Sequence, residues 1–326
     1  MKRLFFSKKN KRSGHIAAFA LAALAMIFLS YALPRLLPGD FVTAMYSSSH
    51  VVLDPGQEAQ LKAYYSQDQG FGTYLIKFLT FEWGYSYAFM DPVSSLIMEA
   101  LPWTLLLLGL ANLLGMALGF YSGVEAAWRQ GPLERGLVSL ATVLEGVPEI
   151  ATSVVLLAVF ALKLGWLPAQ GAETAYAQVG LWQRLGDIFL HMILPLTTLT
   201  LAYAPGNFLL TRNSMIMVLG EPYITTAKAK GLPPARVRYA HSARNALLPL
   251  VTRLGLRMAF MITGALVVET IFAYPGLGTL LYNAISNRDL PLIQGVVLVS
   301  ALVFLGLNLA LEMTYRRLDP RIKDAS

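Results

Sequence analysis

The chain has 326 residues, of which 56% are hydrophobic and 14% charged, with no cysteine and a formal net charge of +7. An average soluble domain has about 45–50% apolar and about 25% charged residues, so this composition excludes a disordered chain and argues against a soluble enzyme. The lack of cysteine excludes disulfides and thiolate metal ligands. The composition predicts an all-α integral membrane protein with several spans.

Six apolar stretches qualify as transmembrane helices, which need about 20 largely apolar residues. Only two acidic residues, Glu145 and Glu149, interrupt the third stretch. We therefore expect six membrane-spanning helices, over residues 16–33, 101–124, 136–162, 188–211, 258–273 and 292–311.

Lysine and arginine are distributed unevenly along the chain. If the N-terminus is cytoplasmic, the segments on the inside contain 20 of the 26 basic residues; these are 1–15, 125–135, 212–257 and 312–326. Cytoplasmic loops are enriched in Lys and Arg, so we expect both termini in the cytoplasm. The basic excess then reflects membrane topology and not a nucleic-acid surface.

The first apolar stretch also has an interpretation as a cleaved signal peptide, because Ser30-Tyr31-Ala32 is a possible cleavage site. The stretch is longer than the usual apolar core of a signal peptide, and its removal would leave five spans, so we favour a retained helix. The expected organisation is a basic cytoplasmic tail (1–15), a first transmembrane helix (16–33), an outer insertion (34–100), a five-helix membrane core (101–311) that includes the cytoplasmic loop 212–257, and a cytoplasmic tail (312–326).

The outer insertion, 34–100, has seven acidic and three basic residues and many aromatic residues. Turn motifs occur at 38–40 (Pro-Gly-Asp) and at 54–56 (Asp-Pro-Gly). We expect short helices that lie on the outer surface.

The cytoplasmic loop, 212–257, begins with one predicted helix. Pro222 suits the first position of a helix that follows Glu221, and the helix is expected to run over 223–230. Gly231 is the expected left-handed residue at its end.

A second helix of this loop is expected from Ala235 to about Leu247, after Pro233-Pro234, with Pro249 closing or kinking it. Arg236, Arg238 and Arg244 lie along this helix. Composition leaves two interpretations open: a basic loop that lies on anionic lipid headgroups, or a helix–turn–helix lever that docks into another protein.

The motif TTAKAKGL at 225–232, followed by HSARNALLP at 241–249, resembles the cytoplasmic "EAA" loop of ABC-importer permeases, in the form of the dipeptide/oligopeptide/nickel branch. Thr225-Thr226-Ala227 stand where the general motif has Glu-Ala-Ala. Further segments that resemble this branch follow in order: PGD at 38–40, WGYS at 83–86, LPWTL at 101–105, GWLP at 165–168, HMILP at 191–195, VETIFAYPGLG at 268–278 and LDPR at 318–321. The chain is most similar to the first-permease type of a two-permease heterodimer.

The resemblance implies a permease subunit in a bacterial inner membrane that forms half of a translocation pathway for peptides or similar small solutes. It also implies four kinds of partner: a second homologous permease, two cytoplasmic ATPase subunits that bind ATP and Mg, an extracytoplasmic binding protein, and the lipid bilayer. The chain has no Gly-Lys-Ser/Thr phosphate loop, so we expect no ATPase activity and no cofactor of its own. The binding protein is expected to dock partly on the acidic outer insertion.

The resemblance further assigns coupling to ATP hydrolysis to the cytoplasmic loop. Its candidate coupling residues are Tyr223, Thr225, Thr226, Ala227, Lys228, Gly231, Leu232, Arg236, Arg238 and His241. Ala227, Ala229 and Val237 are expected to pack into a groove of an ATPase subunit.

Polar groups within the spans are the candidates for the translocation path, namely Glu145, Glu149, Asn112, Tyr203 and Asn207. A charged group at the bilayer centre costs about 2.5–3.5 kcal/mol. Glu145 and Glu149 are spaced to share one helix face, so at least one is expected to face a wet passage and to favour a cationic group. The alternative is that one or both are protonated and bond to a neighbouring span.

Two arginines are expected to have a structural role, and the four histidines are not expected to bind a metal ion. Arg253 and Arg257 are expected to reach the inner headgroups with their charged ends. The four histidines, His15, His50, His191 and His241, lack the spacing of metal ligands, so no metal site is expected.

A second class of function, a self-sufficient secondary transporter or channel, stays open on composition alone. The organised loop at 221–249 favours the ABC permease, because an independent transporter needs no docking lever. The identity of the cargo does not follow from this chain.

Overall fold

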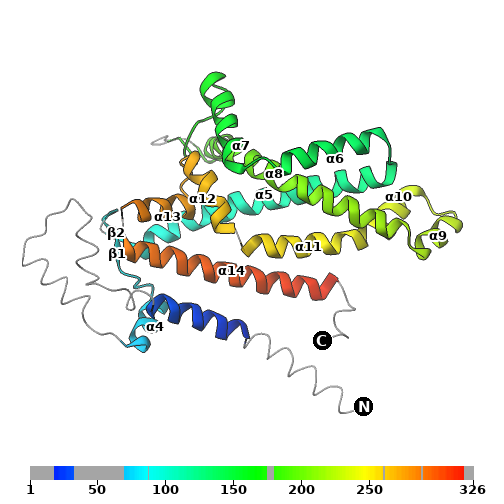
Figure 1. Cartoon of the computed structure of the whole chain (residues 1–326). Coiled ribbons are helices and arrows are strands. Elements are labelled where there is room, and N and C mark those ends of the chain that lie inside the picture. The colour runs from blue at the N-terminus through cyan, green and yellow to red at the C-terminus, as the bar shows by residue number, and fades with distance from the viewer. Residues whose placement is uncertain are drawn as a thin grey trace, which may run out of the picture. The chain divides into compact units, whose positions relative to one another are not determined.

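A computed structural model of the chain describes residues 18–32, 70–86, 88–174, 180–259, 261–287 and 289–318, with 256, 258–259, 261–265 and 311–318 by backbone alone (Figure 1). The described residues are mostly helical and belong to two compact units. The first unit is Met1–Ala100 with Leu280–Met313, and the second is Leu101–Thr279 with Thr314–Ser326. The expected tail 1–15, the motif at 38–40, and His15 and His50 lie outside the described residues.

The first unit is built from apolar helices and a small ribbon. Its elements are the helix Ala18–Ala32, α4 (Phe71–Leu79), the antiparallel strands β1 (Tyr85–Ser86) and β2 (Asp91–Pro92), the start of α5 (Val93–Arg129), most of α13 (Leu277–Ser286), and α14 (Leu290–Leu318). Phe28 meets Phe71 at 5.3 Å between ring centroids, which joins the helix Ala18–Ala32 to α4. Ser86 donates a hydrogen bond of 2.5 Å to the carboxylate of Asp289, which lies just before α14. A short helix is therefore present in the expected insertion as α4, its place on the outer surface stays a prediction, and the ribbon was not predicted.

The second unit contains the remaining helices. They are the rest of α5, α6 (Pro132–Glu145), α7 (Glu149–Leu156) with its π-helical continuation η1 (Leu157–Lys163), α8 (Leu181–Leu219), α9 (Pro222–Ala229), α10 (Pro234–Arg236), the π-helical η2 (Val237–Ala243), α11 (Arg244–Ala259) and α12 (Met261–Ile271).

Helices α5 and α8 pack closely because α5 presents glycines at every fourth position. A Cβ added at Gly115 would lie 2.8 Å from the Cβ of Tyr203, and one added at Gly119 would lie 2.5 Å from the Cβ of Asn207. Gly123 repeats the pattern one turn further on. Small residues at such spacing let membrane helices approach backbone to backbone, so this stripe fixes the register of the two longest helices.

Three described helices are long and apolar enough to cross a membrane: Val93–Arg129, Leu181–Leu219 and Leu290–Ala310. A fourth candidate is formed by α6 together with α7 and η1, and Ala18–Ala32 is a shorter apolar helix. The part of the chain that the structure describes thus confirms a helical membrane protein with three or four spans.

The expected third span, 136–162, is not one continuous helix. α6 and the helix that starts at Glu149 are bent by 96° relative to each other. Pro148 has extended torsion angles (φ −60°, ψ 141°), and a proline disfavours helical geometry in the residue before it. The prediction that Glu145 and Glu149 share one helix face is therefore wrong, because they belong to two differently directed helices.

The second helix of the cytoplasmic loop is longer than predicted. α10, η2 and α11 follow one another without a break from Pro234 to Ala259, and Pro249 lies inside α11. A proline removes one backbone hydrogen bond. Ala246, Leu250 and Val251 are buried on this helix, which packs against α8, so tertiary burial offsets the loss and the helix continues.

Candidate functional site

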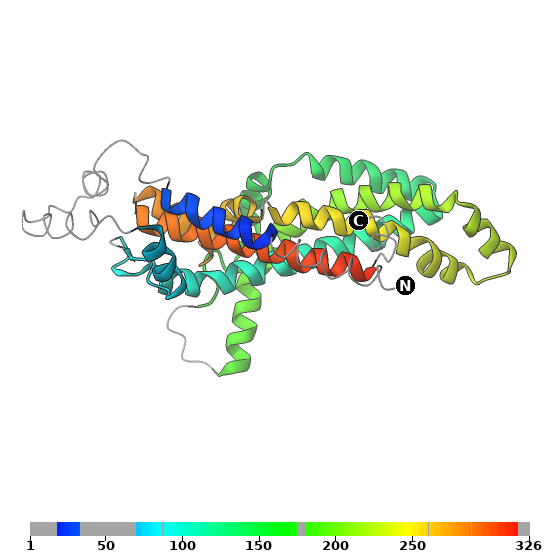
Figure 2. The same cartoon turned by 90° about the horizontal axis from the view of Figure 1, so that it is seen from below.

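The cytoplasmic loop folds as the predicted helix–turn–helix. Gly231 has φ +74°, and its N–H donates to the carbonyl of Lys228 at 2.9 Å. Figures 1 and 2 both show α9 and α10 at one end of the second unit, beyond the end of α11. The first helix and the left-handed glycine are confirmed, whereas the second helix starts as predicted but extends beyond its predicted end.

This helix–turn–helix lever consists of α9, Gly231, α10 and η2. One face of it is buried within the chain itself. Ile224, Ala227 and Val237 form a cluster with 0%, 6% and 1% exposure, covered by Trp128, Val218, Leu219 and Leu232. The expectation that Ala227 and Val237 pack into a partner's groove is therefore wrong, because their side chains fill the angle between α9 and η2. Ala229 is exposed.

Glu125, in the last turns of α5, anchors the second arm of the lever. Its carboxylate accepts hydrogen bonds from Tyr239 (2.5 Å), Arg238 (3.0 Å) and Arg129 (3.1 Å). The hydrogen bond from Tyr239, followed by the charges of Arg238 and Arg129, lowers the pKa of the Glu125 carboxyl. The same hydrogen bond raises the pKa of the Tyr239 hydroxyl.

Arg238 also lies over the Trp128 ring, 5.7 Å from its centroid, and Lys228 lies over the same ring at 5.6 Å. Both basic side chains are thus partly engaged by the end of α5. The sequence analysis missed Glu125 and Trp128; the signal was an acidic residue and an aromatic residue next to a basic loop.

The remaining coupling candidates are exposed or half-buried. Tyr223 is exposed and its hydroxyl accepts a hydrogen bond of 2.6 Å from Asn245. Leu232 and His241 are half-buried. The other exposed candidates are Thr225, Thr226, Gly231 and Arg236.

A second group of charges lies around the broken helix. Arg253, on α11, forms an ion pair of 3.0 Å with Glu145 and donates a hydrogen bond of 3.0 Å to the carbonyl of Gly206 on α8. The guanidinium of Arg257 lies 4.5 Å from the centroid of the Tyr203 ring. The prediction that these two arginines extend to the inner headgroups is wrong, because carboxylate, carbonyl and aromatic partners on α6 and α8 engage them first.

Two of the other path candidates are buried in helix packing. Asn112 is 7% exposed and donates to the carbonyl of Leu108 in its own helix, and Asn207 is 6% exposed and faces Gly119. In the described conformation, both residues therefore pack within or between helices and do not line an open space. Their place in a translocation path stays a prediction.

A buried carboxylate at the end of α12 organises the segment that follows. Glu269 has no exposed surface. Its carboxylate accepts one hydrogen bond of 2.7 Å from the hydroxyl of Thr104 and another of 2.7 Å from the N–H of Gly278. The Thr104 hydroxyl in turn accepts from the N–H of Leu277 at 2.7 Å. A Cβ at Gly276 would collide with the Glu269 carboxylate, so the Pro-Gly-Leu-Gly segment needs its glycine to wrap around this side chain, which sequence analysis did not single out.

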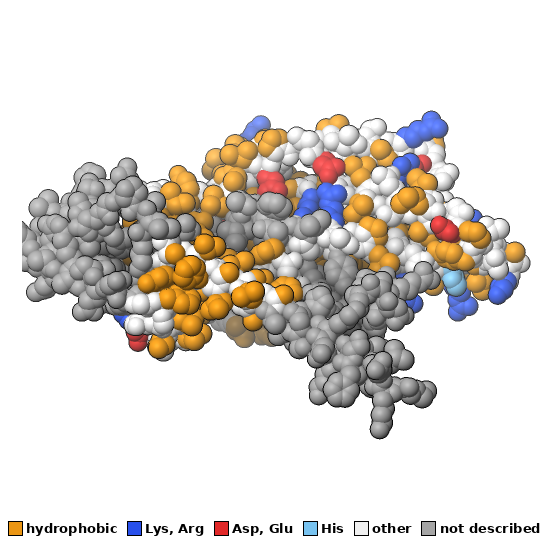
Figure 3. All heavy atoms as spheres, turned by 60° about the horizontal axis from the view of Figure 1, so that its bottom comes forward, with side chains coloured by type: hydrophobic (Ala, Val, Ile, Leu, Met, Phe, Trp, Pro, Cys, Tyr) orange, Lys and Arg blue, Asp and Glu red, His pale blue; other side chains and the backbone are white. Residues whose placement is uncertain are grey.

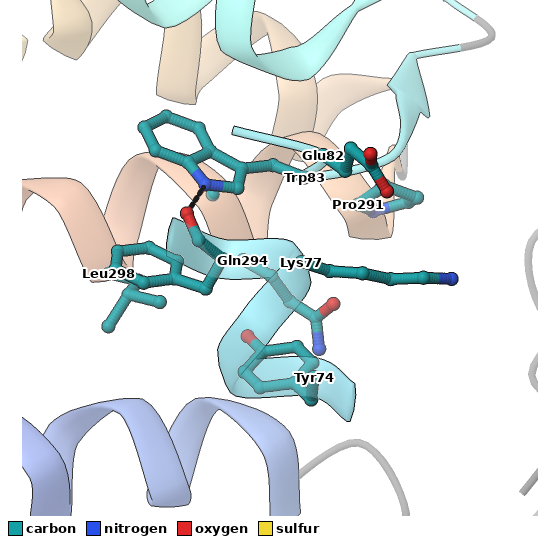
Figure 4. A pocket seen from close by; sticks show the side chains of 9 residues that line it. Tyr74, Lys77, Glu82, Trp83, Pro291, Gln294 and Leu298 are labelled. Atoms are coloured by element: carbon teal, nitrogen blue, oxygen red, sulfur yellow. Dashed lines mark hydrogen bonds between the residues drawn. The ribbon is translucent and has the colours of Figure 1, made fainter. Parts of the chain in front are cut away.

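The first unit has a small pocket of about 80 Å³ between α4 and α14 (Figure 4). Tyr74, Lys77 and Trp83 line one side of it, and Gln294 and Leu298 line the other. The Trp83 indole donates a hydrogen bond of 2.8 Å to the Phe78 carbonyl, which fixes the ring in the wall. Among the described residues, no group of three His, Asp or Glu side chains is suited to hold a metal ion.

Comparison with known proteins agrees with this architecture. Residues 111–324 match the family described as "Binding-protein-dependent transport system inner membrane component". The chain is 33% identical over 317 residues to the probable peptide ABC transporter permease protein y4tP of Sinorhizobium fredii, covering 94% of this chain and 97% of that protein.

Two further relatives have the same extent of similarity. The oligopeptide transport system permease protein AppB of Bacillus subtilis is 33% identical, over 92% of this chain and 95% of its own length. The glutathione transport system permease protein GsiC of Salmonella choleraesuis is 34% identical, over 93% of this chain and 94% of its own length. The chain therefore belongs to the family of inner-membrane permease components of binding-protein-dependent ABC transport systems.

Proposed function

We propose that this chain is one of two homologous permease subunits of an importer for peptides or similar small solutes. In this assembly, two cytoplasmic ATPase subunits bind ATP and Mg and drive transport, and an extracytoplasmic binding protein delivers the cargo. The chain itself hydrolyses nothing and holds no cofactor. Its relatives named for peptides, oligopeptides and glutathione support this class of cargo.

The observation that carries the proposal is the two-sided lever formed by α9, Gly231, α10 and η2. Apolar burial and Glu125 fix one side of the lever, while Thr225, Thr226 and Arg236 stay exposed. A loop that only rests on lipid headgroups needs basic charge, but it needs neither a left-handed hinge nor an anchoring carboxylate. A rigid, anchored projection suits a surface that receives a push from an ATPase.

The proposed topology has six spans with both termini in the cytoplasm. Helix Ala18–Ala32 supplies the first span, and residues 258–273 supply the fifth, in addition to the four candidates described above. The proposed division into tails, outer insertion and five-helix core is as given for 1–15, 16–33, 34–100, 101–311 and 312–326. The outer insertion, with its acidic excess, is the proposed docking site for the binding protein.

Movement of the lever has a direct route into the membrane. η2 continues into α11 without a break, and α11 includes Arg253 and Arg257. A displacement of α9 and α10 by the ATPases is therefore transmitted along one continuous helix to the charged group near Glu145 and Tyr203.

Because the chain contains no cysteine, single-cysteine crosslinking tests the proposal without background. Thr226→Cys labelled with a thiol-reactive photocrosslinker should crosslink to an ATPase subunit in membranes that express the whole system, and the crosslink yield should change when vanadate traps ADP on the ATPases. Arg135→Cys, an exposed position on α6 outside the lever, is the matched control. Purified chain that transports solute alone in liposomes, with no ATPase attached, would instead establish the self-sufficient transporter.

Docking of the binding protein has a separate test. Crosslinks from a photoreactive binding protein should reach the outer insertion 34–100. If all crosslinks map to the second permease, the insertion has no part in docking.

A further inference from the structure

Arg253 joins three helices at one point. From α11 it forms an ion pair of 3.0 Å with Glu145 on α6, and Nη1 of the same guanidinium donates a hydrogen bond of 3.0 Å to the Gly206 carbonyl on α8. α6 and α11 each pack against α8. The guanidinium therefore links the two helices that pack on α8 and holds α8 itself.

The point where these side chains meet has no side chain on α8. Gly206 is buried, and a Cβ at this position would collide with both the guanidinium of Arg253 and the carboxylate of Glu145. Glycine inside a helix is less favourable than alanine, so its place here matches a need for room. The sequence of α8 is thus fitted to this ion pair.

Stability alone does not explain an ion pair at this place. Gly206 belongs to the apolar stretch 188–211, which has no Lys, Arg, Asp or Glu, and charges within spans are costly and face the bundle interior or a water-filled cavity. Apolar side chains of similar size often join helices at least as well as a buried ion pair does. The side chains of Arg253 and Glu145 are 30% and 40% exposed, and Figure 3 shows acidic and basic side chains next to one another on a surface that is otherwise largely apolar or uncharged. A charged, directional link here therefore indicates a role beyond holding the helices together.

The pair connects the lever to the bend of the broken helix. Glu145 is the last residue of α6, and the helix that starts at Glu149 departs at an angle of 96°. Arg253 lies ten residues after Ala243, the last residue of η2, on the same unbroken helix, which is about 15 Å. One stretch of helix and one ion pair therefore separate the lever from the bend.

A second ion pair on α6 provides a comparison. Glu134, in the first turn of α6, accepts a hydrogen bond of 2.8 Å from Arg212 on α8. This pair also joins two helices, but it does not include α11. α6 is thus tied at its start to α8 and at its end to the helix that continues the lever.

We propose that Arg253 and Glu145 are positioning residues for transport, which carry the movement of the lever to the bend of the broken helix. The inference rests on the proposed function and extends its coupling path from the lever to α6. When the ATPases displace the lever, α11 moves Arg253, and the ion pair moves the end of α6 with it. Neither side chain needs to touch the cargo.

The test measures trialanine imported per ATP hydrolysed by the complete complex in proteoliposomes, with the binding protein present. Arg253→Gln should lower this ratio about threefold or more, because it removes a partly exposed charge-assisted hydrogen bond. Gly206→Ala should lower the ratio as well, although both charges remain. Arg253→Lys, which keeps the charge, should retain part of the ratio, and the double variant Glu145→Arg/Arg253→Glu should exceed both of its single variants.

Arg212→Gln is the matched control, because it breaks an ion pair of α6 without touching α11. It should keep the wild-type ratio even if it lowers the melting temperature. The vanadate-dependent crosslink of the labelled Thr226→Cys lever should persist in Arg253→Gln, because the lever still receives the push.

Three results would overturn the inference: a wild-type ratio in Arg253→Gln, an equal fall in Arg212→Gln, or no gain in the charge-swapped double variant. Failure of Arg253→Gln to assemble, restored neither by lysine nor by the charge swap, would show that the pair only holds the fold and would also overturn it.

The same preparations separate the inference from the proposed function. ATPase subunits that co-purify and the crosslink from position 226 report on the proposed function alone. If both are present while Arg253→Gln keeps the wild-type ratio, only the role of the ion pair is refuted. If no ATPase co-purifies, the proposed function fails and the inference fails with it.

Discussion

Replacement of Gly231 tests whether the shape of the lever couples ATP hydrolysis to transport. At φ +74° this residue occupies the left-handed region, which costs an L-residue about 1–2 kcal/mol. A Cβ at this position would meet no atom within 4 Å. The whole effect of Gly231→Ala is therefore backbone strain, and it should reduce the population of the correctly angled lever about 5- to 30-fold.

The choice of substituent makes the prediction graded. Asn tolerates the left-handed region better than other L-residues, so Gly231→Asn should retain most function. A β-branched residue fits it worst, so Gly231→Val should be the most defective. Gly220→Ala is the control, because Gly220 closes α8 with φ −81°, and a Cβ there would be 3.4 Å from the nearest atom.

The assay is the ratio of solute imported to ATP hydrolysed by the reconstituted complex. The ratio should fall in the order Gly, Asn, Ala, Val, while the amount of assembled complex stays close to wild type, because the buried cluster of Ile224, Ala227 and Val237 is untouched. Wild-type coupling in a stably inserted Gly231→Val protein would refute the reasoning. Equal losses for Gly231→Ala and Gly220→Ala would also refute it.

Three further substitutions test other parts of the architecture. Gly119→Ala should lower the melting temperature and the yield of inserted protein, because its Cβ would meet Asn207, whereas Gly109→Ala, with open space around it, should not. Glu125→Gln should speed tryptic cleavage of the lever at neutral pH, because the anchoring carboxylate is lost. The pKa of Glu125 is lowered, so in the wild type the anchor should be intact above the usual carboxyl pKa of about 4.3. It should weaken only as the pH falls through the lowered pKa. Glu269→Leu should lower the melting temperature more than Glu269→Gln, since Gln keeps an acceptor for the N–H of Gly278, and equal melting temperatures would contradict the capping role.

Local sequence rules predicted the lever well because its signals are local. Proline at the first helical position and glycine at a left-handed end depend on a few neighbouring residues, and the structure has both at Pro222 and Gly231. The burial of Ala227 within the chain itself could not be predicted in the same way. An alanine on a helix suits a partner's groove or the chain's own core equally, and only the tertiary fold decides between them.

Long-range partners were beyond the sequence for a related reason. Nothing local links Glu145 to Arg253, which lies 108 residues further along the chain, or Glu269 to Thr104, 165 residues earlier. An apolar stretch with an internal Gly-Val-Pro was expected to be one helix with a possible kink, and the sharp bend at Pro148 became visible only in three dimensions. The bend matters because it gives Glu145 and Glu149 different neighbours.

The ion pair of Glu145 connects the lever to the broken helix. Glu145 is held by Arg253 and Glu149 faces Arg257, and the two arginines are four residues apart on α11, which places them on one side of that helix. α11 is also the inner continuation of the lever through η2. A push on the lever that shifts α11 would therefore act on both arginines at once. Arg253 is tied to Glu145 on α6 and to the Gly206 carbonyl on α8, so a shift of α11 either moves α6 and α8 with it or opens this ion pair.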